Sequence, residues 1–213
     1  MSLDAGAYAA LGRLYDASKV RPEFVIPVLA SESGLDPSRA NAGGYPYYGI
    51  NQASGTYLEA RGIDPQDYLS WPASQQIDQV VTPMMRANVG YLGRAPRSAT
   101  LTYQLNFLPG SVKTAKALCS VIAWRGTAVY NANPGLDWLR LGAIRVDDLA
   151  HFMARALAGA GVKAAIKATY AARPDLGRPS LSPVYGTDFV DPLWWLGAMA
   201  AAGLNEVRRR FAR

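Results

Sequence analysis

Histidine and cysteine are almost absent from this sequence of 213 residues, which contains one of each. The single histidine, His151, argues against a catalytic triad built on histidine and makes a zinc site improbable, because both draw on that side chain. The single cysteine, Cys119, excludes a disulfide bond within the chain, and its apolar neighbours predict a core residue. Glutamate is also scarce, with only four in the chain, at positions 23, 32, 59 and 206.

Long apolar runs are missing as well. Met1 is followed by a polar helical start and not by a basic segment with an apolar core, so no secretion signal is visible. The apolar part of the last expected helix runs over 12 residues, from Leu193 to Leu204, which is too short to cross a bilayer. We therefore expect no transmembrane segment.

The charge balance is basic. Lysine and arginine outnumber aspartate and glutamate by 22 to 16, which gives a net charge of +6. This excess favours an anionic partner such as nucleic acid, a membrane surface or a bacterial cell wall, although a basic protein without such a partner would look the same. No basic run with interleaved aromatic residues occurs outside the C-terminal tail, so we expect no nucleic-acid partner.

The pattern of apolar residues predicts an all-α fold. Half of the residues are apolar, and few segments alternate between apolar and polar residues. We expect a main helical domain over residues 1–172, a proline-rich linker over 173–189, and a C-terminal amphipathic helix over 190–213 that packs on the domain or on a partner. Within the domain we expect helices over residues 4–19, 22–34, 55–61, 73–93 with a bend at Pro83, 98–107, 112–124, 145–158 and 162–172, with a short helix after Asp64.

One glutamate, Glu32, lies on the apolar face of a helix. Val25, Val28, Leu29 and Glu32 follow the i, i+3, i+4, i+7 spacing, so the carboxyl group continues the stripe that packs inward. Gly34 then ends the helix. A carboxylate in such a position is costly unless it is paired, protonated or used in chemistry. The alternative is a glutamate that bonds backbone groups of the next loop.

Three short motifs give this glutamate a context. Glu32-Ser33-Gly34 is followed by Gly49-Ile50-Asn51-Gln52 and, further on, by Tyr130-Asn131. In this order they resemble the catalytic domain of lytic transglycosylases, the relatives of goose-type lysozyme, although Asn51 replaces a methionine of that family. The resemblance implies a lysozyme-like helical domain. The helix expected over residues 190–213 would be a C-terminal extension of this domain.

A narrower resemblance concerns residues 103–109 and 130–137, which are similar to segments of bacteriophage tail-associated proteins. It implies a virion-associated enzyme that acts at the bacterial cell wall, in the periplasm or outside the cell, with virion proteins as possible partners. In those proteins the second segment continues into a calcium-type loop. Asp137, Gly142, Ile144 and Asp148 match positions one, six, eight and twelve of that loop, whereas Leu139 and Leu141 occupy positions three and five, where oxygen ligands belong. We therefore expect the loop shape without a metal.

Peptidoglycan is the substrate that the resemblance implies, with cleavage of the β-1,4 bond between N-acetylmuramic acid and N-acetylglucosamine. Glu32 would act alone as acid and then as base, assisted by the N-acetyl group of the substrate, with no cofactor and no metal. A carboxyl group half-buried among apolar residues keeps its proton near neutral pH, which suits the acid. A second carboxylate, as ordinary glycosidases need, could come from Asp36, but Asp36 more often makes a turn in such a segment.

Supporting residues follow by position. Tyr130 is expected to aim its hydroxyl group at Glu32 or, alternatively, to be a core tyrosine, and Ser33 is expected to bind substrate or to cap backbone groups. We expect one or more of Tyr45, Tyr47 and Tyr48 to line the glycan groove or, alternatively, to hold the loop between Glu32 and Gln52 to the core. We also expect Tyr103 and Asn106 to line the far wall of the groove. The expected substrate-binding residues are Ser33, Gln52, Tyr130, Tyr48, Asn51 and Tyr103.

Two other functions remain open from the sequence. The same site would suit a hydrolytic muramidase, or lysozyme. The replaced methionine and the altered loop would also suit a catalytically inactive phage structural or cell-wall-binding protein.

Overall fold

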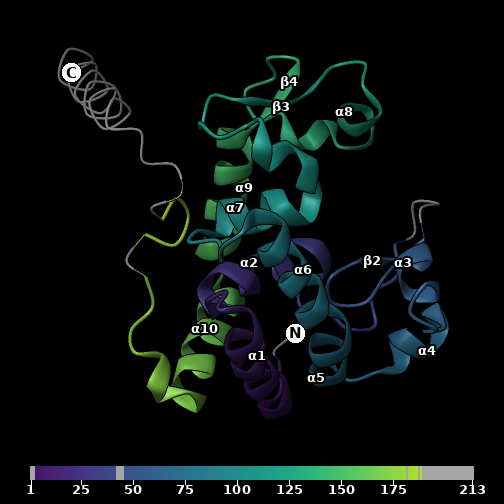
Figure 1. Cartoon of the computed structure of the whole chain (residues 1–213), viewed down its shortest axis with the longest axis vertical. Helices are drawn as coiled ribbons and strands as arrows, with labels where there is room; N and C mark the ends of the chain where they lie inside the picture. The colour runs from purple at the N-terminus through teal and green to yellow at the C-terminus, as the bar shows by residue number, and fades with distance from the viewer. Residues whose placement is uncertain (1–2, 42–45, 181, 187, 189–213) are drawn as a thin grey trace.

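The computed structural model describes residues 3–41, 46–180, 182–186 and 188, and these residues are mostly helical (Figure 1). Two small antiparallel sheets of two strands each complete the described part. The predicted α-rich class is thus confirmed. The predicted helix over 190–213 and Tyr45 lie outside the described residues. Of the described helices, none is both long and apolar enough to cross a membrane.

The first half of the chain contains α1 Ala5–Ser18, α2 Pro22–Ser33, β1 Tyr47–Tyr48, β2 Ala53–Ser54, α3 Gly55–Glu59, α4 Pro65–Ser70, α5 Ala73–Gln76, a π-helical turn Ile77–Val81 and α6 Thr82–Leu92. The second half contains α7 Ala99–Phe107, a 3-10 turn Pro109–Lys113, β3 Val121–Trp124, α8 Ala128–Ala132, a 3-10 turn Pro134–Leu136, β4 Ala143–Arg145, α9 Val146–Ala158, α10 Ala160–Ala172 and a 3-10 turn Pro174–Leu176.

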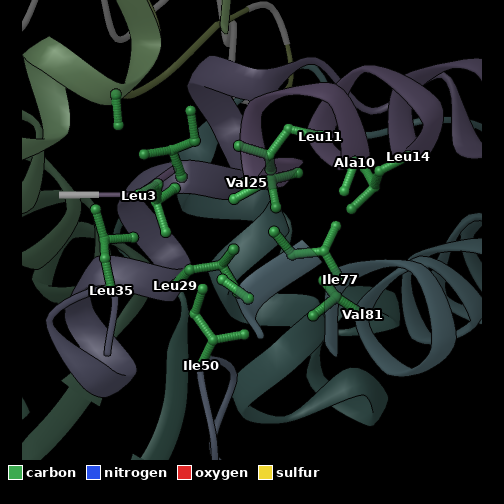
Figure 2. Close-up of a cluster of buried hydrophobic side chains, with 14 of the residues drawn as sticks. Leu3, Ala10, Leu11, Leu14, Val25, Leu29, Leu35, Ile50, Ile77 and Val81 are labelled. Atoms are coloured by element: carbon green, nitrogen blue, oxygen red, sulfur yellow. The ribbon is translucent and has the colours of Figure 1, made fainter. Parts of the chain in front are cut away.

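Helix α2 lies in the middle of the fold and contacts α7, α9 and α10 (Figure 1). Pro22 starts it at a position where no backbone donor is needed, and every residue from 22 to 29 is buried. Val25 and Leu29 belong to a core that also includes Leu11 of α1 and Ile77 (Figure 2). Because α2 is enclosed along most of its length, the position of its last turn is fixed by packing.

The start of α2 is tied to the region that follows α10. The buried carboxylate of Glu23 accepts hydrogen bonds from Arg21 (2.8 Å), from the Tyr170 hydroxyl group and from the backbone N–H of Ser180 (2.8 Å). Asp188 likewise accepts hydrogen bonds near the start of α7. The described part of the proline-rich segment is therefore held against the helical domain.

The long helix predicted over residues 73–93 is present with an irregular middle. Its ladder widens to π geometry over Ile77–Val81, where the N–H of Thr82 donates to the carbonyl of Ile77. Pro83 has no N–H to continue the regular pattern, and the irregular turn directly precedes it. The predicted disturbance at Pro83 is thus present one turn earlier, as a π turn.

The helix predicted over residues 112–124 is wrong. A 3-10 turn at Pro109–Lys113 is followed by an irregular segment and by β3, which pairs with β4. The β-branched residues Val121 and Ile122 favour this strand, because a pleated surface accommodates them well. The predicted burial of Cys119 is also wrong: its side chain is exposed, and the adjacent Leu118 takes the core position.

The loop from Asp137 to Asp148 keeps its shape through backbone donors. Asp137 accepts hydrogen bonds from the N–H groups of residues 141 and 142, and Asp148 accepts them from residues 138 and 145, all at 2.8–3.1 Å. Gly142 has a φ of +76°, which favours glycine. Leu139 and Leu141 are more than half exposed. Both carboxylates thus hold the loop together themselves.

Gln76 organises the loop after α2. Its side chain is completely buried, its Oε1 accepts the N–H of Ile50 (2.8 Å), and its Nε2 donates to the carbonyls of Pro37 and Tyr68 (both 2.8 Å). Gly49, with a φ of +73°, lies so close that an added Cβ would be 2.5 Å from this Oε1. One amide group therefore holds Pro37 at the start of this loop and Gly49 and Ile50 at its end.

Gln76→Leu should lower the free energy of unfolding by roughly 2–4 kcal/mol, because the buried N–H of Ile50 loses its acceptor and the carbonyls of Pro37, Tyr68 and Trp71 lose a donor. Urea unfolding followed by circular dichroism measures this. The matched control is Gln75→Leu, because Gln75 is only half-buried and its side chain makes none of these bonds. Equal losses in the two variants would contradict the role given to Gln76.

Candidate active site

A cleft of about 450 Å³ lies at the end of α2. Its walls come from four parts of the chain that are far apart in sequence: the end of α2, the loop between α2 and β2, helix α7 and the end of α8 (Figure 1). The lining residues are Glu32, Arg39, Asn41, Tyr47, Gln52, Tyr103, Asn106, Phe107, Ala132 and Asn133.

Glu32 presents the cleft's carboxyl group. It is the second-last residue of α2, which ends before Gly34 at a φ of +73°. Asn106 donates a hydrogen bond from Nδ2 to its Oε1 at 3.1 Å. Burial raises the pKa of Glu32 to about 7, although the hydrogen bond from Asn106 opposes this. Near neutral pH the group can therefore both give and take a proton.

Gln52 lines the cleft as predicted, and its orientation is fixed by the backbone. Its Nε2 donates to the carbonyls of Gly49 (2.9 Å) and Arg39 (3.1 Å), which leaves its Oε1 as the acceptor of the side chain. Asn51 is different, because it is buried away from the cleft, where its Oδ1 accepts from Tyr68 (2.7 Å). The prediction of Asn51 as a substrate-binding residue is wrong, since this amide supports the core behind the turn.

Ser33 holds the loop rather than a substrate. It is buried, and its hydroxyl group donates to the carbonyl of Ile50 (2.8 Å) and accepts the N–H of Asp36 (3.2 Å). The expected substrate contact is thus wrong, and the alternative, a cap of backbone groups, is confirmed. Ser33 and Gln76 bind the two sides of Ile50, its carbonyl and its N–H.

The tyrosine beside Glu32 is Tyr103 and not Tyr130. Tyr103 lines the cleft, and burial together with the nearby Glu32 carboxylate raises its pKa. The Tyr130 hydroxyl group donates to Asp137 Oδ2 at 2.8 Å, within the loop of residues 137–148. The prediction that Tyr130 orients Glu32 is wrong, because the Tyr130 hydroxyl group donates its hydrogen bond to Asp137 and not to Glu32. The alternative of a core tyrosine is confirmed.

Adjacent tyrosines of β1 have opposite roles, because neighbouring side chains of a strand point to opposite faces. Tyr47 is 40% exposed and lines the cleft. Tyr48 packs against a core that includes Leu58 and Tyr68. The choice of Tyr48 as a substrate-binding residue is therefore wrong, and of these two tyrosines Tyr47 is the one that lines the cleft.

Asp36 is not a second carboxylate of the cleft. Its Oδ1 accepts hydrogen bonds from the backbone N–H (2.9 Å) and the hydroxyl group (2.7 Å) of Ser38, and these bonds lower its pKa. It makes the turn that the sequence favoured. In the part of the chain that the structure describes, Glu32 is thus the only residue with a carboxyl group that lines the cleft.

Tyr103 and Asn106, the two residues predicted for the far wall, both line the cleft and lie one turn apart on α7. Phe107 adds an aromatic surface and stacks on Tyr103, with ring centres 6.0 Å apart. Sequence reasoning missed the lining residues Arg39 and Asn133. Arg39 had one signal, because it is the only charged side chain between Asp36 and Tyr48.

Glu32→Gln should stabilise the protein at alkaline pH. The folded state raises the pKa of Glu32 from 4.5 to about 7, so its contribution to stability is complete below pH 4.5 and is lost as the pH rises through about 7. Glutamine does not ionise. We expect the variant to match the wild type near pH 4 and to exceed it by roughly 1–3 kcal/mol near pH 8 in urea unfolding. The exposed Glu59, changed to glutamine, should show no such pH dependence.

Comparison of the chain with protein-family models, with curated proteins and with solved structures finds no match. What the cleft does is therefore inferred from its own residues.

Proposed function

We propose that this protein is a peptidoglycan lytic transglycosylase with a lysozyme-like fold. The observation that carries the proposal is Glu32, a carboxyl group at the end of a buried helix that opens into a cleft and has a pKa of about 7. Breaking a glycosidic bond requires an acid that protonates the leaving oxygen. A carboxyl group that keeps its proton near neutral pH supplies this acid.

The first step would transfer the proton of Glu32 to the oxygen between the two sugars, and the bond from that oxygen to the muramic C1 breaks. A retaining or inverting glycosidase would use a second carboxylate at this point. Since Glu32 is the only carboxyl group among the described residues that line the cleft, the proposed assistance comes from the N-acetyl group of the substrate, whose carbonyl oxygen attacks C1.

The second step would close an anhydro ring. Glu32, now ionised, takes the proton of the muramic 6-hydroxyl group, whose oxygen displaces the N-acetyl oxygen at C1. Glu32 is then protonated again, so the site is ready for another cleavage without a cofactor. A pKa near the working pH suits a group that both gives and takes a proton.

The remaining lining residues suit a glycan. Gln52 offers its Oε1 to an N–H or hydroxyl group, and Asn106 keeps the Glu32 carboxyl group in place. Tyr47 and Phe107 provide aromatic surfaces on which the apolar face of a sugar ring can pack. The resemblance of residues 103–109 and 130–137 to phage tail-associated proteins supports a location on a virion at the cell wall.

Glu32→Gln should abolish the clearing of a suspension of bacterial cell walls, because the amide cannot donate the proton. The reduction in rate should be at least about 100-fold. The control is Asp36→Asn, which removes a carboxylate outside the cleft and should retain activity if the variant folds. Equal clearing by wild type and Glu32→Gln would refute the enzyme and favour a non-catalytic wall-binding protein.

Mass spectrometry of the released fragments decides between the two reactions. A transglycosylase leaves anhydro-muramyl ends, whereas a muramidase leaves reducing ends that are heavier by one water. We expect the anhydro ends.

The pH profile of cleavage should fall as the pH rises through about 7, because the first step needs protonated Glu32. Asn106→Ala removes the hydrogen bond that lowers the pKa of Glu32, so the alkaline limb should move to higher pH. Asn131→Ala, an exposed asparagine outside the cleft, should leave the limb in place. An unmoved limb in Asn106→Ala would show that Asn106 does not act on the titration of Glu32.

A further inference from the structure

Of the lining residues that the structure describes, Arg39 is the one with a cationic side chain. It belongs to the loop that Gln76 and Ser33 hold in place. Its carbonyl accepts hydrogen bonds from the N–H of Gly49 (2.8 Å) and from Gln52 Nε2 (3.1 Å), and the next residue, Ala40, bridges to Tyr48. The backbone beneath this guanidinium is therefore fixed on both sides, although the side chain itself is exposed.

The guanidinium of Arg39 is unpaired within residues 3–41, 46–180, 182–186 and 188. Four other arginines form ion pairs with carboxylates, namely Arg13, Arg21, Arg94 and Arg173. Within the described part of the chain, no acceptor takes a hydrogen bond from the Arg39 side chain. Its nearest carboxylate in sequence, Asp36, directs an oxygen to Ser38, and Arg39 acts on it only through its charge. The five donors of Arg39 are thus free for a ligand.

The charges of the cleft favour an anion at this position. Within the described lining, only Glu32 has a carboxyl group and only Arg39 a guanidinium group, and Glu32 is largely protonated below neutral pH. Under those conditions the cleft carries one net positive charge, on the wall formed by the loop. A planar guanidinium binds a carboxylate through two parallel hydrogen bonds.

We propose that Arg39 binds a carboxylate carried by the glycan and so makes the cleft selective for anionic over neutral β-1,4-linked amino sugars. The inference rests on the proposed function and adds a specificity-determining residue to it. Two carboxylates have the required chemistry: the lactyl group of a muramic acid without peptide, and an acidic group of the peptide stem. Chitin oligomers have the same backbone linkage and carry no such group.

The test compares the wild type with Arg39→Gln on three substrates. These are cell-wall glycan with its peptide stems, the same glycan after an amidase has removed the stems, and a neutral chitin oligomer. Arg39→Gln should raise KM by about tenfold on the anionic glycan and change kcat little, because a charge-assisted pair is lost away from the reacting bond. KM on chitin should not change. Arg86→Gln, which removes an exposed cation outside the cleft, is the matched control.

The first two substrates identify the carboxylate. An increase in KM only on the stem-free glycan assigns the lactyl carboxylate, because an attached stem converts that group to an amide. An increase only with stems present assigns an acidic group of the stem, and an increase on both glycans shows that Arg39 accepts either carboxylate. Added salt should reduce the difference between wild type and Arg39→Gln, because the exposed pair is screened. Equal KM values for the two proteins on both glycans, or an equal loss on chitin, would overturn the proposal.

Binding separates this inference from the proposed reaction. Calorimetry measures the affinity of Glu32→Gln and of the double variant Glu32→Gln/Arg39→Gln for soluble fragments of the anionic glycan. We expect about tenfold weaker binding by the double variant. If the wild type cleaves nothing but this difference is present, the transglycosylase is refuted and the anion site stands. If the wild type cleaves and neither KM nor affinity depends on Arg39, the anion site is refuted and the enzyme stands.

Discussion

The cleft depends on the way in which two buried polar side chains satisfy the backbone of one residue, Ile50. Gln76 accepts its N–H and Ser33 donates to its carbonyl, so the turn after β1 is fastened both to α5 and to the end of α2. Neither bond has access to water that would replace it, since both side chains are buried. Gln52 follows in the same turn and donates to the carbonyl of Arg39, so both residues are held in the lining of the cleft that α7 also lines.

The same packing sets the chemistry of Glu32. Helix α2 is enclosed by other helices, so its last turn cannot move outward to hydrate the carboxyl group. Burial therefore raises the pKa, and the C-terminal end of the helix also disfavours a negative charge there. Asn106 compensates in part through one hydrogen bond. Glu32 can thus act as an acid near neutral pH because it lies where a buried helix ends, and Asn106 of α7 lowers its pKa in part.

Periodicity and end signals predicted most of the helices and the position of Glu32, because these features are local. The roles of Ser33, Asn51, Tyr48 and Tyr130 could not be assigned in this way. Each has a polar group near the right motif, but its partner is a backbone group or a side chain that tertiary packing brings close, such as Tyr68 or Asp137. Tyr47 and Tyr48 are neighbours in β1, and the sequence did not show which of them faces the cleft and which faces the core. The strand β3 was missed because its partner β4 is about 20 residues away, and pairing at that distance leaves little trace in local pattern.

Arg39 and Glu32 line the same cleft, although a cation close to Glu32 would favour loss of the proton that the proposed reaction needs. A cation beside Glu32 would stabilise its ionised form and lower the pKa, which would remove the proton that the proposed first step needs. A cation far from the cleft would not contact the glycan. The effects that set the pKa of Glu32 are burial and the Asn106 hydrogen bond, whereas the charge of Arg39 acts on Asp36. The anchored loop thus carries the cation in the lining of the cleft, where it can attract an anionic glycan while the acid stays protonated.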